Sequence, residues 1–112
     1  MRAGKIVKLP AEQVSGTAAD GLRAMYVGTI TFEHIRRYVD DIVTVSEEEI
    51  AEAVRILARN PQTVAEPSGA VAPAAWLFHR DSLPASGATV ALISGGNIDP
   101  ETLNALRKSD AR

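Results

Sequence analysis

Two short runs of strand-forming residues constrain the fold of this chain more than any other feature of its sequence. Residues 41–45 and 89–93 are dense in valine, isoleucine and threonine. Runs of this kind are typical of strands that are covered on both faces of a parallel sheet. Because parallel strands need long crossover connections, the two runs predict an α/β fold with a partial, doubly wound parallel sheet.

Helical patterns lie before, between and after the two runs. In residues 31–38 the apolar side chains recur at spacings of three and four, which predicts a helix with one buried face. Ser46 and Glu49 are spaced as a capping box, so a second helix of about thirteen residues is expected to begin there. Asp99 is a favourable N-cap for a last helix, which is expected over residues 100–107.

A further helix is expected to begin at Pro67 or Ser68 and to run to Phe78. Pro73 lies inside this pattern. In a helix interior proline removes a hydrogen bond and costs about 3 kcal/mol, unless it falls in the first turn. The helix therefore either begins later than its pattern suggests or is kinked at the proline.

The remaining segments are short. Residues 6–9 predict a strand that Pro10 ends, and residues 11–21 are small and polar, which is typical of a loop. A turn at Ser86 and Gly87 leads into the second strand-forming run. From the first long helix onward, the expected order is helix, strand, helix, helix, strand, helix, which implies parallel pairing of the strands.

Composition bounds the size and the class of the protein. The 112 residues are 46% hydrophobic and 23% charged, which is enough for one packed domain and too little for two. The net charge of -2, with basic residues scattered along the chain, argues against a nucleic-acid partner. No apolar run is long enough to cross a membrane, no cysteine is present, and no signal-peptide pattern opens the chain. These features favour a cytoplasmic protein.

Catalytic and metal-binding groups are not evident from the residues. His34 and His79 lie in helical patterns with no second ligand at metal spacing, so both are interpreted as structural and no metal site is predicted. None of Lys5, Lys8 and Lys108 has the apolar flanks that would lower the pKa of an amine for Schiff-base chemistry. The acidic run that opens the second helix is explained by capping and by solvation. No catalytic residue is predicted.

Three polar segments are candidate binding sites. The residues from Ser94 to Asn97 follow a predicted strand, where ligands bind in open α/β sheets, although a tight turn explains the same glycine pattern. Glu66 has apolar neighbours, so desolvation favours its neutral form or requires a hydrogen-bond donor, and an exposed acid at a helix start fits as well. Asp20 and Gly21 are more often a turn than a site.

Four collinear segments resemble the C-terminal part of the threonine/serine dehydratase (threonine ammonia-lyase) and serine racemase family. They are TAADGL at residues 17–22, TFEHIRRYVDDIVTVS at 31–46, EPSGA at 66–70 and SGGNID at 94–99. The resemblance covers nearly the whole chain and implies a pyridoxal 5'-phosphate enzyme of fold type II, with the tryptophan-synthase-β-like fold. Pro73 and residues 60–63 depart from the family pattern.

The resemblance also implies roles for single residues. Ser94 would share a hydrogen bond with the pyridine nitrogen of the cofactor. A neutral hydroxyl makes the cofactor ring a milder electron sink than a carboxylate would, and a mild sink suits β-elimination. Gly21 would bring the backbone up to the cofactor, with Asp20 beside it near the substrate. Glu66 would lie near the cofactor ring, and Asn97 would support the turn.

By the same resemblance, the chain supplies only part of an enzyme. The family's Schiff-base lysine, substrate loop, glycine-rich phosphate loop and divalent-cation ligands all precede the region that residues 1–112 resemble. We expect a single segment without the N-terminal half, inactive alone. The intact enzyme would deaminate L-threonine or L-serine to a 2-oxo acid and ammonia, or racemise serine. Two alternatives stay open: the chain is a non-catalytic module that completes a separately encoded N-terminal half, or it is a decayed remnant. The partner would be that N-terminal half or a second copy in a homo-oligomer.

Overall fold

The computed structural model describes residues 3–85 and 87–109. Its helical elements, in chain order, are α1 (Ala11–Val14), η1 (Asp20–Leu22), α2 (Thr29–Tyr38), α3 (Glu47–Ala58), η2 (Ser68–Ala70), α4 (Val71–Phe78), η3 (Arg80–Ser82) and α5 (Pro100–Ser109). Over these two stretches no β-strand is assigned. None of the helices in the described residues has the length and apolar character that a membrane crossing requires.

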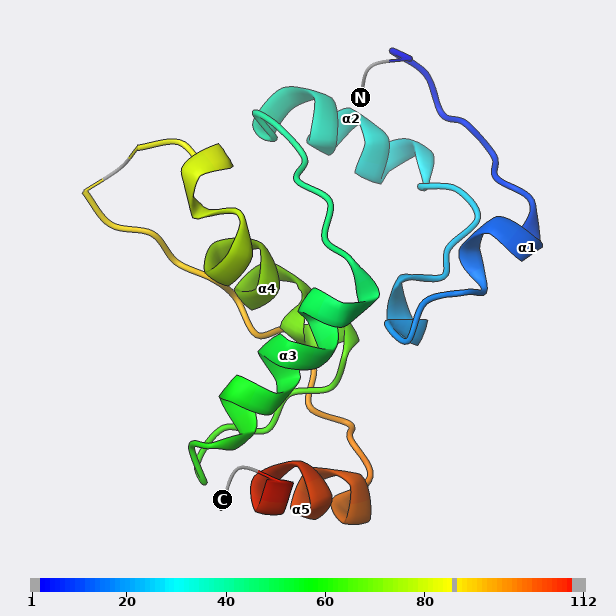
Figure 1. Cartoon of the computed structure of the whole chain (residues 1–112). Coiled ribbons are helices and arrows are strands. Elements are labelled where there is room, and N and C mark those ends of the chain that lie inside the picture. The colour runs from blue at the N-terminus through cyan, green and yellow to red at the C-terminus, as the bar shows by residue number, and fades with distance from the viewer. Residues whose placement is uncertain (1–2, 86, 110–112) are drawn as a thin grey trace.

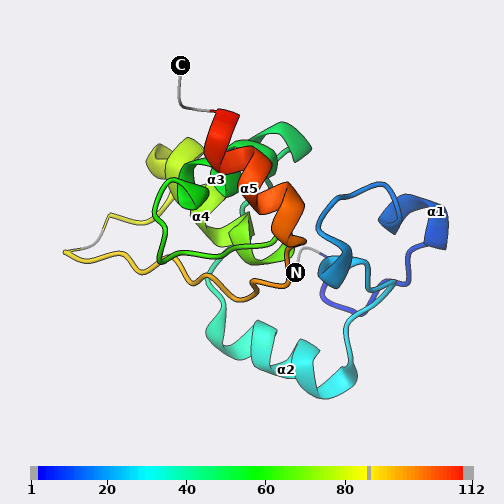
Figure 2. The same ribbon diagram turned by 90° about the horizontal axis from the view of Figure 1, so that it is seen from below.

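The helices gather into one packed group with an open N-terminal part. Figure 1 shows α3, α4 and α5 together, with α1 and α2 set apart, and Figure 2 shows the same separation from below. The radius of gyration of the Cα atoms is 15.6 Å. A compact chain of this length would have about 13 Å. The chain is therefore more open than a closed domain of its size.

The core lies between α3 and α4. Apolar residues on one face of α3, including Ala53 and Val54, are buried together with Ala70 and Ala74. Side chains this small let the two helices approach closely, since the distance between helix axes depends on the side chains at the contact. Larger, partly buried side chains close the edges of this core: Val45, Leu57, Leu77, Ile98 and Leu106.

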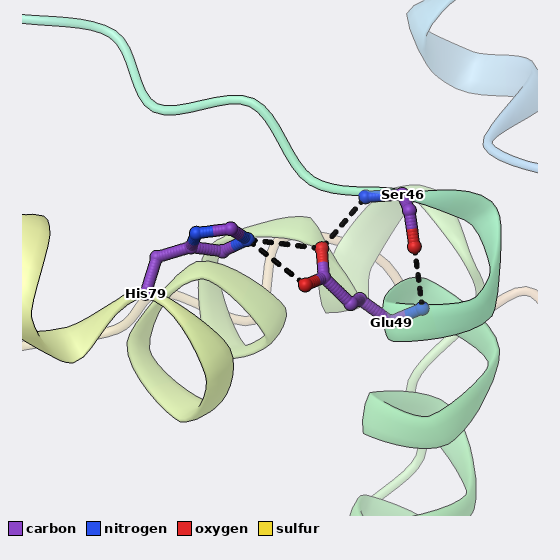
Figure 3. Close-up of polar contacts among 3 residues, drawn as sticks. All are labelled: Ser46, Glu49 and His79. Atoms are coloured by element: carbon purple, nitrogen blue, oxygen red, sulfur yellow. Dashed lines mark hydrogen bonds and ion pairs between the residues drawn. The ribbon is translucent and has the colours of Figure 1, made fainter.

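α3 begins with the predicted capping box, which is confirmed. The Ser46 backbone N–H donates to Glu49 Oε2 at 2.7 Å, and the Glu49 N–H donates to Ser46 Oγ at 3.2 Å. The Glu49 carboxylate also accepts a hydrogen bond from His79 Nε2 at 3.0 Å (Figure 3). Because His79 is the C-cap of α4, this carboxylate ties the start of α3 to the end of α4.

Pro73 lies in the first turn of α4, which begins at Val71. The preceding residues form the separate 3-10 turn η2 rather than more α-helix. The first amides of a helix have no intrahelical acceptor, so a missing N–H in that turn costs little. Of the two alternatives that the sequence left open, the later start is confirmed. Pro73 and the following Ala74 are both buried.

α5 is capped as predicted and anchored at its other end. Asp99 Oδ2 accepts the Thr102 backbone N–H at 2.8 Å. Near the C-terminal end of α5, the Arg107 guanidinium donates to the backbone carbonyls of Ala58 at 3.1 Å and Pro61 at 3.2 Å. These carbonyls lie at and just beyond the C-terminal end of α3, where helix carbonyls have no intrahelical donor. Arg107 thus holds α5 against α3.

The N-terminal part differs from its prediction in detail. α2 begins at Thr29, two residues before the predicted start, with Gly28 as its N-cap. The predicted loop over residues 11–21 contains the short helix α1 and the beginning of η1. Of the predicted turn before the second strand-forming run, Gly87 lies in a bend and Ser86 lies outside the described residues.

The three predicted strands are the main correction. Residues 6–9, 41–45 and 89–93 form no β-ladder in the described part of the chain, so the partial, doubly wound parallel sheet is not confirmed. A strand exists only where its backbone N–H and C=O groups pair with a neighbour, and these runs do not pair with one another. Apolar side chains in these runs are exposed to solvent: Val90 is 89% exposed and Leu92 is 69% exposed.

Candidate functional site

The Glu66 carboxylate joins the segment before η2 to the turn that precedes α5. The Asn97 backbone N–H donates to Glu66 Oε2 at 2.8 Å, and the Glu66 N–H donates to the Gly95 carbonyl at 3.1 Å. Glu66 is half-buried. The donor that a carboxylate in this apolar setting requires is therefore the Asn97 amide.

Glycines allow these two segments to touch. A Cβ at Gly95 would stand 2.3 Å from Glu66 Oε1, and a Cβ at Gly69 would stand 2.2 Å from the Gly95 carbonyl oxygen. Both separations are far shorter than real carbon–oxygen contacts, so a larger residue at Gly69 would push the two backbones apart, and one at Gly95 would displace the Glu66 carboxylate. The sequence interpretation gave Gly95 and Gly96 to ligand approach or to a tight turn, and a Cβ at Gly96 would likewise stand 2.9 Å from the Val64 carbonyl oxygen. In the structure, protein fills the space where their side chains would stand.

Asp20 and Gly21 reach the same region from the N-terminal side. The Gly21 backbone N–H donates to Ser68 Oγ at 2.9 Å and to Asp20 Oδ1 at 2.8 Å. The Ser68 hydroxyl in turn donates to Asp20 Oδ1 at 3.3 Å. Since Ser68 is the first residue of η2 and follows Glu66 by two positions, one short segment contacts both predicted binding regions.

We name this arrangement the junction cluster, and its members are Asp20, Gly21, Glu66, Ser68, Gly95 and Asn97. Ser94 lies at its edge, because it directly precedes Gly95 in the chain. The Ser94 side chain is exposed and hydrogen-bonds to no other residue of the described chain. The structure therefore joins Glu66 to Asn97 and joins Asp20 and Gly21 to Ser68, two positions beyond Glu66, and it places Ser94 beside them only through the chain.

Sequence reasoning missed the role of Ser68. It was interpreted only as a helix start, although it carries the contact to Gly21 and Asp20. The partners are separated by 47 residues for Gly21 and by 48 for Asp20, so no local pattern could indicate them. The one available signal was its position inside the EPSGA motif.

No lysine within the described residues makes a hydrogen bond or an ion pair with this cluster. Lys8 Nζ lies 5.8 Å from the centre of the Tyr26 ring. Lys5 lines a small cavity in the N-terminal part, together with Phe32 and Ile42. Over the described ranges, no group of three or more histidine, aspartate or glutamate side chains is arranged to hold a metal ion.

Comparison with known proteins assigns a family. The family model described as pyridoxal-phosphate dependent enzyme matches residues 1–95. The L-threonine ammonia-lyase of Geobacter sulfurreducens is 43% identical over 104 residues, which are 93% of this chain and 25% of that protein. A solved threonine deaminase from T.th. superposes with a TM-score of 0.74 at 42% identity, over 88% of this chain and 32% of that one. Maize serine racemase superposes with a TM-score of 0.73 at 34% identity, over 96% of this chain and 34% of that one.

These matches confirm the resemblance seen in the sequence, because threonine ammonia-lyase and serine racemase are both among the relatives. The backbone arrangement of the two solved relatives is shared over most of this chain. The chain spans about a quarter to a third of the length of the relatives that it matches. Dependence on pyridoxal phosphate is the property that names the matched family. The chain belongs to the pyridoxal-phosphate dependent enzyme family.

Proposed function

We propose that this chain forms the pyridine-side part of the cofactor site of a threonine/serine dehydratase-like lyase. The intact enzyme would convert L-threonine or L-serine to a 2-oxo acid and ammonia by β-elimination. The observation that carries the proposal is the contact of Glu66 with Asn97 and Gly95, which fixes the turn next to Ser94. Relatives named L-threonine ammonia-lyase and serine racemase support the reaction class.

Ser94 and the adjoining junction cluster fit one side of a pyridoxal phosphate ring. Ser94 offers an exposed hydroxyl with no hydrogen bond inside the described chain, so it is free to meet a ring nitrogen. A neutral hydroxyl hydrogen-bonds to that nitrogen without stabilising a full positive charge there. When bound, the cofactor supplies an electron sink for the substrate, and this choice of partner makes it a mild one.

The residues of the junction cluster set the shape of the site. Glu66 holds the turn by accepting the Asn97 amide, and Ser68 holds Gly21 in place. The lack of a side chain at Gly21 lets its backbone approach Ser68, since a Cβ there would stand 3.1 Å from Ser68 Oγ, and we assign this backbone to the border of the cofactor site. Asp20, whose carboxylate is exposed next to Ser68, is the acid that we assign to the substrate side.

We further propose that the chain is inactive alone. Covalent attachment of pyridoxal phosphate needs a lysine amine beside the site. Lys5 lines a cavity with Phe32, Lys8 lies over Tyr26 and Lys108 is an exposed residue of α5, and none of the three contacts the junction cluster. The lysine is therefore assigned to the longer portion of the relatives that this chain does not match.

A second candidate function is a non-catalytic module that completes a separately encoded N-terminal half. The open apolar side chains favour it, since Val90 is 89% exposed, Leu92 69% and Ile42 58%. Strand-forming backbone with uncovered apolar side chains is suited to pairing with a strand from a partner. A decayed remnant would carry the same surface without a partner. The coding sequence upstream of Met1 separates these cases, because it shows whether the lysine-bearing half is fused, separate or lost.

The activity test has two arms. Purified chain with pyridoxal phosphate and L-threonine is expected to form no 2-oxobutyrate, and formation of this product would overturn the inactivity proposal. In the second arm, this chain replaces the matched 104 residues of the Geobacter relative. The chimera is expected to form 2-oxobutyrate from L-threonine or pyruvate from L-serine, whereas D-serine as the sole product would indicate a racemase instead. A folded chimera with none of these products would overturn the assignment.

Ser94→Ala in the same chimera tests the cofactor contact. We expect a shifted absorbance maximum of the bound cofactor and a lower kcat, because the ring nitrogen loses its partner. Ser82→Ala is the matched control, since Ser82 is an exposed serine of η3 on a separate segment. An unchanged spectrum in the Ser94 variant would remove Ser94 from the site.

A further inference from the structure

Glu47 makes contacts that helix capping does not explain. It is the first residue of α3, but the capping box is closed by Glu49. The Glu47 side chain instead reaches the segment before η1, where its Oε2 accepts the Ala18 backbone N–H at 2.8 Å. The Thr17 hydroxyl, beside the same carboxyl, helps to hold its pKa below the usual value. The interpretation of this acidic run as capping and solvation alone is therefore incomplete.

The segment that Glu47 holds leads directly into the junction cluster. Thr17 Oγ1 accepts the Ala19 backbone N–H at 3.0 Å, and Arg23 Nε donates to the Thr17 carbonyl at 3.1 Å. Ala19 is 1% exposed, so the segment is buried at its centre. The next residues are Asp20 and Gly21, whose other contact is Ser68 on η2. Residues 17–21 are thus held at one end by α3 and at the other by η2.

The charges around Glu47 suit this role. Hydrogen bonds from Thr17 and Ala18, with the positive charge of Arg23, hold the pKa of the Glu47 carboxyl below its usual value. Arg55 lines the same small cavity as Glu47, one side of which is formed by Ala18. The carboxylate of Glu49, on the same helical turn, faces Ser46 and His79 instead.

We infer that Glu47 is a positioning residue whose carboxylate fixes residues 17–19 and thereby sets the place of Asp20 and Gly21 against Ser68. The importance of that placement for cofactor and substrate rests on the proposed function. The placement itself is a property of the chain without cofactor. It can therefore be tested independently of any activity.

The test uses amide nuclear magnetic resonance of the 112-residue chain without cofactor. In the unsubstituted chain, the Ala18 amide shift is expected to titrate with an apparent pKa below 4.5, the ordinary value of a glutamate carboxyl. In Glu47→Gln this titration is expected to disappear, and the Gly21 amide is expected to exchange with solvent several-fold faster. Glu48→Gln removes the same charge from the same helical turn and should change neither signal.

Three results would overturn the inference. The first is an Ala18 amide in the unsubstituted chain whose chemical shift has the random-coil value and does not titrate. This result does not depend on whether any variant folds. The second is loss of the Ala18 titration in Glu47→Gln with no change in Gly21 exchange, which would leave Glu47 as a local contact only. The third is an equal effect in Glu48→Gln, which would make the effect one of helix charge. Inactivity of the chimera would contradict the proposed function and leave all three readouts unaffected.

Discussion

Asn97 donates its backbone N–H to the Glu66 carboxylate at 2.8 Å across 31 residues of sequence. This bond connects the segment that begins the η2–α4 region with the turn that leads into α5. The Glu66 N–H returns a bond to the Gly95 carbonyl, so the two segments are joined in both directions. The position of the EPSGA motif at residues 66–70 relative to the SGGNID motif at residues 94–99 depends on this pair of bonds.

Glu66→Ala is expected to loosen the turn before α5. The variant removes the acceptor of the Asn97 amide, and a hydrogen bond to a charged group contributes about 1.5–3 kcal/mol when it is buried. Because Glu66 is only half-buried, we expect a loss of about 1 kcal/mol in the free energy of unfolding. Urea denaturation measures this loss, and amide exchange at Asn97 localises it. Glu12→Ala on the exposed face of α1 is the control, and an equal loss there would contradict the prediction.

Gly69→Ala is expected to destabilise the chain more than a typical glycine substitution. Its new Cβ would stand 2.2 Å from the Gly95 carbonyl oxygen and 2.6 Å from the Gly95 nitrogen. These are backbone atoms, which cannot rotate away, so the overpacking cost lies toward the upper end of about 1–3 kcal/mol. The urea midpoint of the variant measures it. Gly16→Ala, where no atom lies within 4 Å of the new Cβ, should be nearly neutral.

Local chemistry allowed the starts of α3 and α5 to be predicted. The capping box joins Ser46 and Glu49, which are three positions apart, and Asp99 caps α5 through Thr102, also three positions on. Interactions over one helical turn are visible in a sequence because the turn fixes which residues meet. Pro73 limited α4 to two possible forms for the same reason, and its structure is one of them.

Local patterns did not reveal that the predicted sheet would be missing from the described chain, and they did not reveal the junction cluster. A run such as residues 89–93 indicates a tendency to form a strand, but a strand also needs a neighbouring strand, and the described chain provides none. The bonds from Gly21 to Ser68 and from Ala18 to Glu47 cross 47 and 29 residues. The residues at both ends of such bonds look ordinary until the fold brings them together.

Arg107→Ala is expected to release α5 from α3. The guanidinium donates hydrogen bonds to the Ala58 carbonyl at 3.1 Å and to the Pro61 carbonyl at 3.2 Å, so its loss leaves both carbonyls without that donor. We expect a loss of about 1 kcal/mol in the free energy of unfolding and faster amide exchange throughout α5. Lys108→Ala removes the neighbouring exposed cation and should preserve that exchange pattern. Equal exchange in the two variants would show that Arg107 does not anchor α5.

Acid is expected to weaken the tie between α3 and α4 through Glu49. The Ser46 backbone N–H and the His79 ring hold the pKa of the Glu49 carboxyl below its ordinary value of 4.5. A carboxyl with a lowered folded-state pKa contributes stability that is fully present above its unfolded pKa and is lost as the pH falls through its folded pKa. The temperature of half-unfolding should therefore decrease as the pH is lowered from about 5 to about 3.

Glu49→Gln tests the contribution of this one carboxyl to that acid dependence. The variant keeps an oxygen acceptor for Ser46 but cannot titrate, so its thermal midpoint should depend less steeply on pH over this range. Some slope should remain, because hydrogen bonds also lower the pKa of Glu47 and of Asp99. Glu48→Gln should keep the slope of the unsubstituted chain. If Glu49→Gln keeps it as well, the Glu49 pair with His79 does not link the two helices in a pH-dependent way.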